Sequence, residues 1–139
     1  MSAFDVATRF FHDCESLKGW QGCRQHVADG AAFDAQSEAL TDVRTVQAYC
    51  DWMAGLGSGP LAGGTYTLHA AGWDEANRTA LFFATYSASH TGEGGPVPPT
   101  GRHVDAHYVY ALRMNADDKV DEMTKIWHSQ HSMVALGWV

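Results

Sequence analysis

The sequence has little positive charge and no long hydrophobic run. Lys and Arg together number 9 among 139 residues, against 16 Asp and Glu, and the formal net charge is −7. Because phosphate binding needs clustered Lys and Arg and these residues are scattered singly, the composition argues against a nucleic-acid partner and against an anionic membrane surface. No run of about 18 apolar residues occurs, so we also expect no membrane span.

The N-terminal segment lacks the features of a signal peptide. Asp5 stands near its start, and no continuous apolar core follows. We therefore expect a cytoplasmic protein.

Metal-binding motifs are also lacking. The cysteines Cys14, Cys23 and Cys50 are odd in number and have no CxxC spacing, so we expect neither a disulfide framework nor a zinc site and interpret them as small buried hydrophobic residues. His103 and His107 stand four positions apart, which in an extended strand separates them by about 13 Å. The sequence thus predicts no metal and no cofactor.

The composition that is present describes one compact domain over residues 1–139. Hydrophobic residues make up 45% and charged residues 18% of the chain, values typical of a folded globular protein. A chain of this length buries roughly two thirds of the surface that its unfolded form exposes, so a second core is not required.

The first half of the chain has helical patterns. Helical spacing of apolar residues predicts a first helix over about 3–17 and a shorter one over about 20–27, followed by a short strand at 31–35. Thr41 is a candidate cap for a third helix, which glycines and Pro60 end.

The second half alternates with a period of two. It predicts a hairpin of strands at 65–73 and 79–90, then strands at about 104–114 and 119–128 after a flexible Gly/Pro-rich break. Helices followed by consecutive strands favour an α+β fold, in which N-terminal helices pack on one face of a curved mixed or antiparallel sheet. One face of that sheet would form the wall of a cavity.

Several segments carry a resemblance to a known family. Residues 89–93 read SHTGE, 98–104 read PPTGRHV and 119–122 read KVDE, with Trp127 following. These segments resemble the SnoaL-like polyketide cyclase group of the nuclear transport factor 2-like superfamily. The resemblance implies a cone-shaped, cystatin-like α+β fold with an apolar cavity, and a homodimer. It also implies acid/base chemistry by an Asp on the last strand, a position that Lys125 occupies here.

Strand alternation selects the residues that face this cavity. Met123, Lys125 and Trp127 share one face of the last strand. On the strand at 104–114, the face better suited to line the pocket carries Tyr108 and Tyr110. On the strand at 79–90, the corresponding face carries Tyr86 and His90. We expect Tyr86, Tyr108, Tyr110, Met123 and Trp127 to contact the ligand.

Lys125 has two interpretations. Its stem can cover apolar surface while the ammonium reaches the cavity mouth or a carboxylate, or it can be desolvated, with a lowered pKa, and hold an anionic oxygen. Asp34 is the carboxylate that we expect to reach the cavity from the helical side. Asp34, His90 and Lys125 are therefore the candidate catalytic residues, and an inert Asp34–Lys125 ion pair is the alternative.

Two functions fit these residues. The first is a cofactor-independent cyclase, isomerase or hydratase that acts on a small apolar molecule with a carbonyl or hydroxyl group. The alternative is a non-catalytic ligand-binding or dimerisation module of the same fold. Asp105, His107 and Arg113, on the opposite face of the sheet, are the candidate dimer surface.

Overall fold

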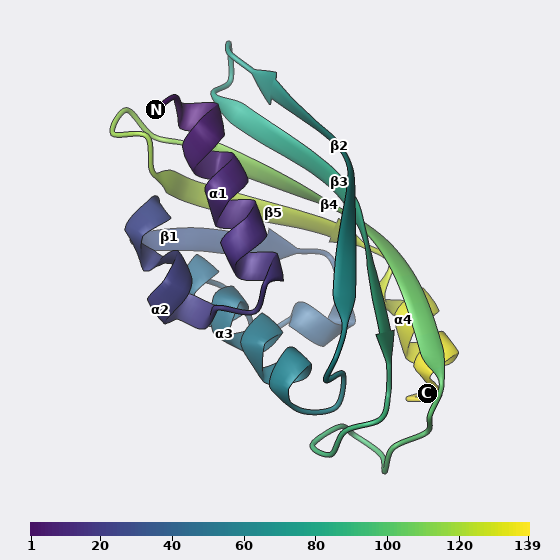
Figure 1. Ribbon diagram of the computed structural model, residues 1–139. Coiled ribbons are helices and arrows are strands. Elements are labelled where there is room, and N and C mark those ends of the chain that lie inside the picture. Colours follow the sequence, from purple (N-terminus) through teal and green to yellow (C-terminus); the bar gives the residue numbers. More distant parts are fainter.

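A five-stranded sheet with helices on its inner face forms the computed structural model, which describes residues 1–139 (Figure 1). The strand order is β1-β5-β4-β3-β2. β1 (Val27–Ala35) pairs in parallel with β5 (Val120–Trp127), whereas β2 (Thr65–Asp74), β3 (Thr79–Ser89) and β4 (His103–Met114) form antiparallel ladders. The sheet is mixed and open, which confirms the predicted α+β class.

Four α-helices and two 3₁₀ turns complete the fold. They are α1 (Ala3–Glu15), α2 (Gly19–Cys23), η1 (Arg24–His26), η2 (Glu38–Leu40), α3 (Val46–Ser58) and α4 (Ser129–Leu136). The second helix is shorter than predicted and passes through η1 into a strand that begins at Val27. The sequence patterns did not predict α4, which packs against β4. No helix is long and apolar enough to cross a membrane.

The start of α1 is fixed by local hydrogen bonds. The Ser2 hydroxyl accepts from the Asp5 amide, and the Asp5 carboxylate accepts from the Ser2 amide, each at 3.1 Å. This capping box satisfies backbone donors that the helix leaves without partners. The helix then places Phe11 against the sheet, where its ring stacks on Phe82 at 4.9 Å.

The start of α3 differs from the prediction. Thr45, not Thr41, is the cap, and its hydroxyl accepts from the Ala48 amide at 3.1 Å. Thr41 lies in the turn after η2 and donates to the Glu38 carbonyl. From this start, α3 turns Tyr49 inward, and its ring stacks on Phe33 of β1 at 4.5 Å.

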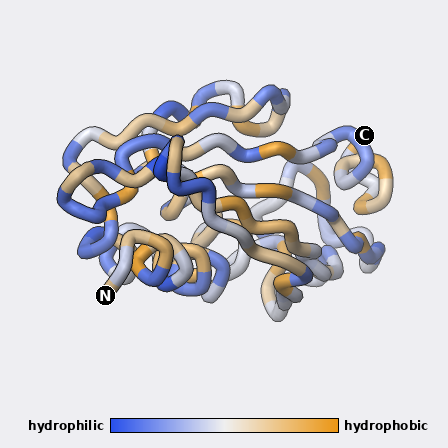
Figure 2. The backbone as a smooth tube through the Cα atoms, turned by 90° about the horizontal axis from the view of Figure 1, so that it is seen from above, coloured by the Kyte–Doolittle hydropathy of each residue, from blue (hydrophilic) through white to orange (hydrophobic).

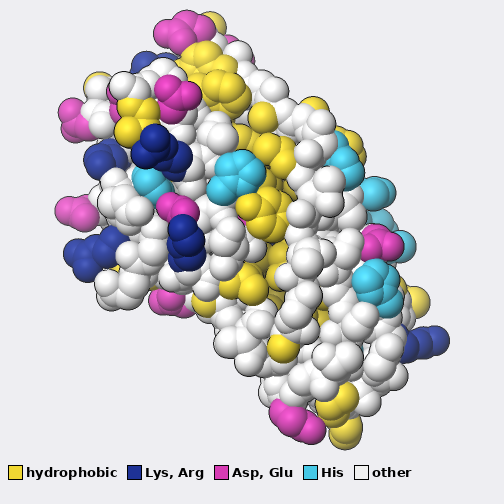
Figure 3. Space-filling model, in the orientation of Figure 1, with side chains coloured by type: hydrophobic (Ala, Val, Ile, Leu, Met, Phe, Trp, Pro, Cys, Tyr) yellow, Lys and Arg dark blue, Asp and Glu magenta, His cyan; other side chains and the backbone are white.

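Buried side chains form two clusters along the inner face of the sheet. The larger one lies between the sheet and α1, α2 and α3, and the smaller one lies near α4 and includes Leu61, Val104 and Leu136. Hydrophobic segments accordingly run along the strands, while hydrophilic segments gather at turns (Figure 2). A band of hydrophobic side chains also reaches the surface between the helices and the outer strands (Figure 3).

Candidate functional site

A buried carboxylate at the end of α1 is the centre of the candidate site. Glu15 exposes 2% of its surface and accepts hydrogen bonds from the hydroxyls of Tyr108 and Tyr110, the latter at 2.8 Å. The Tyr110 hydroxyl shares a second hydrogen bond with that of Tyr49. Lys125 Nζ donates to the Tyr49 hydroxyl at 2.9 Å. A continuous hydrogen-bonded chain, here called the Glu15–Lys125 network, therefore joins an acid and a base.

Aromatic rings surround the ammonium of Lys125. Its Nζ lies 4.4 to 6.0 Å from the centres of five rings, which belong to Trp127, Tyr49, Trp52, Tyr108 and Tyr110. Ring faces attract cations at such distances. The residue exposes only 6% of its surface, so the ammonium is not at a solvated rim. Of the two interpretations of Lys125, the structure favours the desolvated one.

Burial shifts both ends of the network toward neutrality. Burial lowers the pKa of Lys125 to about 8, and the negative charge of Glu15 opposes that shift. Burial raises the pKa of Glu15, against the opposing effects of the Tyr108 hydrogen bond and the charge of Lys125. An acid and a base whose pKa values approach each other in one site are suited to proton transfer near neutral pH.

A cavity of about 70 Å³ borders this network. Twelve of its fifteen lining residues are hydrophobic. Most lining residues come from α3, α4 and the strands β3, β4 and β5, with Glu15 from α1, Leu61 from the turn after α3 and Trp138 from the segment after α4. The full set is Glu15, Trp52, Met53, Leu56, Leu61, Tyr86, Val104, Ala106, Tyr108, Lys125, Trp127, Ser132, Met133, Leu136 and Trp138. Drug-sized ligand sites enclose roughly 300–1,000 Å³, so this conformation has room only for a small molecule.

Four of the predicted site residues line the cavity: Tyr86, Tyr108, Lys125 and Trp127. Burial and the charge of Glu15 raise the pKa of Tyr86 to about 12, so its hydroxyl stays protonated at neutral pH. Tyr110 and Met123 are fully buried and do not line the cavity. Tyr110 belongs instead to the network, and Met123 belongs to the core.

Asp34 does not reach the cavity, contrary to expectation. It is exposed, while its neighbour Phe33 is buried. The register explains this, because Asp34 pairs with Thr124, and Ala35 pairs with Lys125. Since paired residues in a sheet share a face and consecutive residues alternate, Asp34 projects from the face opposite to Lys125. The structure therefore forms no Asp34–Lys125 pair.

His90 is buried but lies outside the cavity lining, so it does not join Lys125. Its Nδ1 accepts hydrogen bonds from Trp138 Nε1 at 2.9 Å and from the Thr100 amide at 3.3 Å. Its backbone carbonyl accepts from the Gly101 amide, and its Nε2 is buried without a partner. His90 thus fastens the Gly/Pro-rich loop and the C-terminal segment to the end of β3.

Sequence reasoning missed the carboxylate of the site. Glu15 follows Phe11 by four positions and therefore continues the apolar stripe of the first helix, a pattern that could have identified it. Tyr49 and Trp52 lie on α3, which the sequence predicted, but their approach to Lys125 depends on how α3 crosses the sheet. Ser132, which accepts from Trp127 Nε1 at 3.1 Å, lies on the helix that was not predicted.

The cavity offers few groups for a metal. Glu15 is the one carboxylate in its lining, and no His or Cys lines it. The structure has one cluster of three potential metal ligands, formed by the three cysteines, and it lies elsewhere.

Comparisons with known proteins support the fold. No protein-family model and no curated protein sequence matches the chain. Solved structures do match, including IdmH from Streptomyces antibioticus, described as a candidate polyketide cyclase, at a TM-score of 0.77 and 15% identity over 99% of both chains. A protein from Jannaschia sp. CCS1, described as a candidate SnoaL-like polyketide cyclase, matches at a TM-score of 0.75 and 18% identity over 96% of this chain and 90% of that one. An NTF2-like protein from Burkholderia thailandensis E264 matches at 0.73 and 14% identity over 97% of both chains. The chain therefore has the fold of the SnoaL-like, nuclear transport factor 2-like proteins.

Proposed function

We propose that this protein is a cofactor-independent enzyme of the cyclase or isomerase type, which moves a proton on a small apolar carbonyl compound. One observation carries the proposal: the buried Glu15 and Lys125 are joined through tyrosine hydroxyls at the wall of an apolar cavity. The neighbours described as polyketide cyclases share this fold at low identity. They support an enzyme of this general type. The reaction itself is argued from the residues of the site.

The two charged groups have separate roles in the proposed reaction. The Glu15 carboxylate removes a proton from the carbon beside the carbonyl, and the electron pair of that C–H bond moves onto the carbonyl oxygen. The Lys125 ammonium stabilises the resulting enolate oxygen, since it keeps N–H groups beyond the one given to Tyr49. Return of the proton to another carbon completes an isomerisation, and attack of the enolate carbon on a second carbonyl closes a ring. Glu15 thus takes the catalytic role for which Asp34 and His90 were the candidates.

The tyrosines position this pair. Tyr108 and Tyr110 hold the two carboxylate oxygens of Glu15 from alternate positions on the inner face of β4. Tyr86 keeps its hydroxyl free of any protein hydrogen bond and lines the cavity, so it is suited to donate to a carbonyl or hydroxyl of the ligand.

Hydrogen–deuterium exchange on small ketones tests the proposal directly. The protein is incubated in D₂O with cyclohexanone, 2-tetralone and acetylacetone, and the loss of the protons beside the carbonyl is followed by NMR. We expect exchange above the buffer rate for at least one ketone, and a decrease of about 10²–10⁴-fold in Glu15→Gln, the range typical of a lost general base. Asp34→Asn, which changes an exposed carboxylate on the other face, is the control and should exchange like wild type.

A non-catalytic binding module is the second candidate, because most of the cavity lining is apolar. The same ketones distinguish the two. Thermal stabilisation by a ketone without any exchange of its protons would favour the module, whereas equal exchange by wild type and Glu15→Gln would remove Glu15 from the proposed chemistry.

We also propose a homodimer through the outer face of the sheet. Phe83, Val109 and Ile126 lie side by side in the ladder across β3, β4 and β5, and Phe83 and Ile126 expose 42% and 60% of their surfaces. Such a row of exposed apolar side chains is typical of an interface. The predicted dimer residues Asp105, His107 and Arg113 are exposed on this same face of β4.

A further inference from the structure

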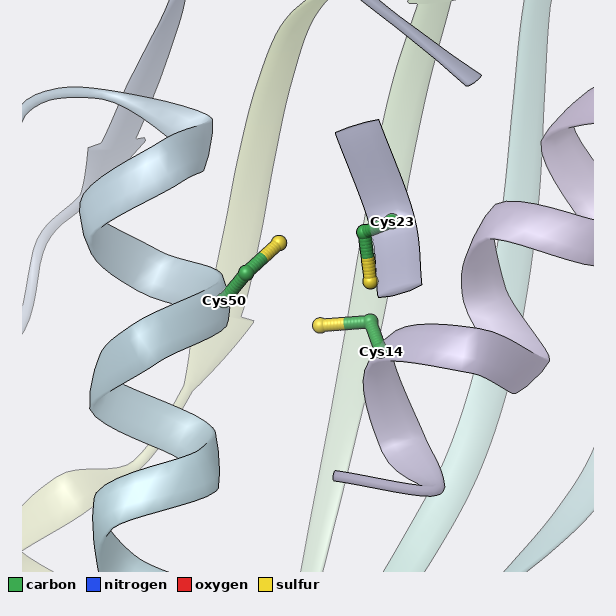
Figure 4. Close-up of side chains that lie close together, drawn as sticks. All are labelled: Cys14, Cys23 and Cys50. Carbon is green, nitrogen blue, oxygen red and sulfur yellow. The ribbon is translucent and has the colours of Figure 1, made fainter. Parts of the chain in front are cut away.

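The three cysteines of the chain converge in the helical layer. Cys14 lies near the end of α1, Cys23 ends α2 and Cys50 lies within α3, and all three are buried. Their Sγ atoms lie within 4.8 Å of one another, and the side chains point toward a common centre (Figure 4). Burial of each thiol was expected from the sequence, but their convergence was not, because the cysteines have no motif spacing.

We propose that Cys14, Cys23 and Cys50 form a three-sulfur site for a soft monovalent metal ion, Cu(I). Metal–thiolate bonds are about 2.3 Å long, so three sulfurs in a trigonal plane around one ion stand about 4 Å apart. The observed spacing allows this arrangement with small side-chain adjustments. Each thiol that becomes a thiolate ligand releases one proton.

The ligand set selects the ion. Thiolate ligands favour Cu(I) over hard cations. Structural zinc sites almost always have four ligands, and this cluster has no fourth Cys, His or carboxylate among the groups that converge. The three thiols are 0–1% exposed, so solvent does not supply that ligand. Cu(I) accepts three sulfurs, and the site therefore discriminates against zinc.

Charged groups around the cluster act in both directions. His26 favours a thiolate at Cys23, whereas Asp13 disfavours it, and Glu15 disfavours a thiolate at Cys14. The positive charge that offsets the thiolates would therefore come mainly from the bound ion.

The thiol cluster also adjoins the Glu15–Lys125 network. Cys14 directly precedes Glu15 on α1, and Cys50 directly follows Tyr49 on α3. An ion at the sulfurs would thus be held by the same turns of α1 and α3 that carry Glu15 and Tyr49. Metal binding at this site does not require that the Glu15–Lys125 network be catalytic.

A copper competition tests the site. The reduced full-length protein is titrated anaerobically with Cu(I) in the presence of bathocuproine disulfonate, whose copper complex is coloured. We expect one equivalent of Cu(I) to be withheld from the chelator, together with near-ultraviolet sulfur-to-copper absorption. Zn²⁺ in a parallel titration should bind at least about 100-fold more weakly.

Single variants locate the ligands. Cys14→Ala, Cys23→Ala and Cys50→Ala should each lower the Cu(I) affinity at least about 100-fold, and thermal unfolding without metal shows whether each variant is folded. Cys50→Val keeps an apolar side chain of similar size and should lose Cu(I) binding with an intact fold. Transfer of all copper to the chelator by wild type, or wild-type affinity in a folded Cys50→Val, would overturn the proposal.

Discussion

Lys125 is the residue whose environment departs most from that of an ordinary lysine. Lysines are almost never fully buried unless they are paired, and this one is compensated by aromatic faces, the Tyr49 hydroxyl and the charge of Glu15. Burial still dominates and lowers its pKa to about 8 from 10.5. The position therefore costs stability in the pH range where the ammonium persists.

This cost predicts a pH dependence of folding. Between about pH 8 and 10.5 the unfolded chain keeps the Lys125 proton that the folded protein has released, so the free energy of unfolding rises with pH across that window. The gain is about 3 kcal/mol at 1.36 kcal/mol per pKa unit. Denaturant unfolding of wild type and Lys125→Met at pH 7 and pH 10 tests this. The rise in the free energy of unfolding between the two pH values should be larger in wild type than in Lys125→Met. An equal response of both proteins to pH would contradict the desolvated state of Lys125.

The same residue predicts the pH profile of ketone exchange. The active form has Glu15 ionised and Lys125 protonated, so the rate rises through the raised pKa of Glu15 and falls above about pH 8. Arg keeps its charge above pH 12, so Lys125→Arg should lose the alkaline decline, even with a lower maximal rate. If the rate of Lys125→Arg still declined at alkaline pH, the decline would come from the titration of a group other than Lys125.

At the scale of elements, His90 joins parts of the chain that the sheet does not. Its ring holds Trp138 beyond the end of α4 and Thr100 in the loop before β4, while its backbone pairs with Arg102. Three contributors to the cavity wall, Leu136, Trp138 and Val104, lie beside these contacts.

Removal of this ring should loosen one wall of the cavity. In His90→Ala we expect faster amide hydrogen exchange over residues 129–138, by at least about tenfold, because the Trp138 hydrogen bond is lost. Amides of α1 lie in the other cluster and should exchange as in wild type. Mass spectrometry measures the exchange of both segments. An equal increase in both would indicate global destabilisation and would contradict a local role of the His90 ring.

The sequence predicted the strands and helices better than the tertiary contacts between them. Alternation placed Lys125 and Trp127 on the inner face correctly, because a two-residue period depends only on local geometry. The prediction for Asp34 was wrong although the same alternation argues against it, since Asp34 directly follows Phe33, which is buried on the inner face. Helical spacing puts Glu15 on the apolar stripe of α1, but its connection to Tyr49 through Tyr110 arises from the packing of α1 and α3 on β4, which no local pattern encodes.

At the scale of the whole molecule, the outer sheet face predicts self-association. Phe83→Glu would place a charge in the apolar row of Phe83, Val109 and Ile126, and we expect light scattering to give a monomer mass for this variant and a dimer mass for wild type. Val134→Glu, at a position on α4 that is 52% exposed, is the matched control and should remain dimeric. A monomeric wild type would refute the proposed dimer.

The parallel pairing of β1 with β5 also has a consequence for how the chain acquires its shape. β1 is made early and β5 late, so this edge of the sheet forms only by a contact between distant parts of the sequence. Such contacts slow folding, because a long loop must close before they form. Until β5 emerges from the ribosome, the edge of β1 has no ladder partner, and the aromatic rings of α3 and β4 wait for Lys125. The nascent chain therefore passes through a period in which the β1 edge is open, and this is when we expect chaperone binding to matter most.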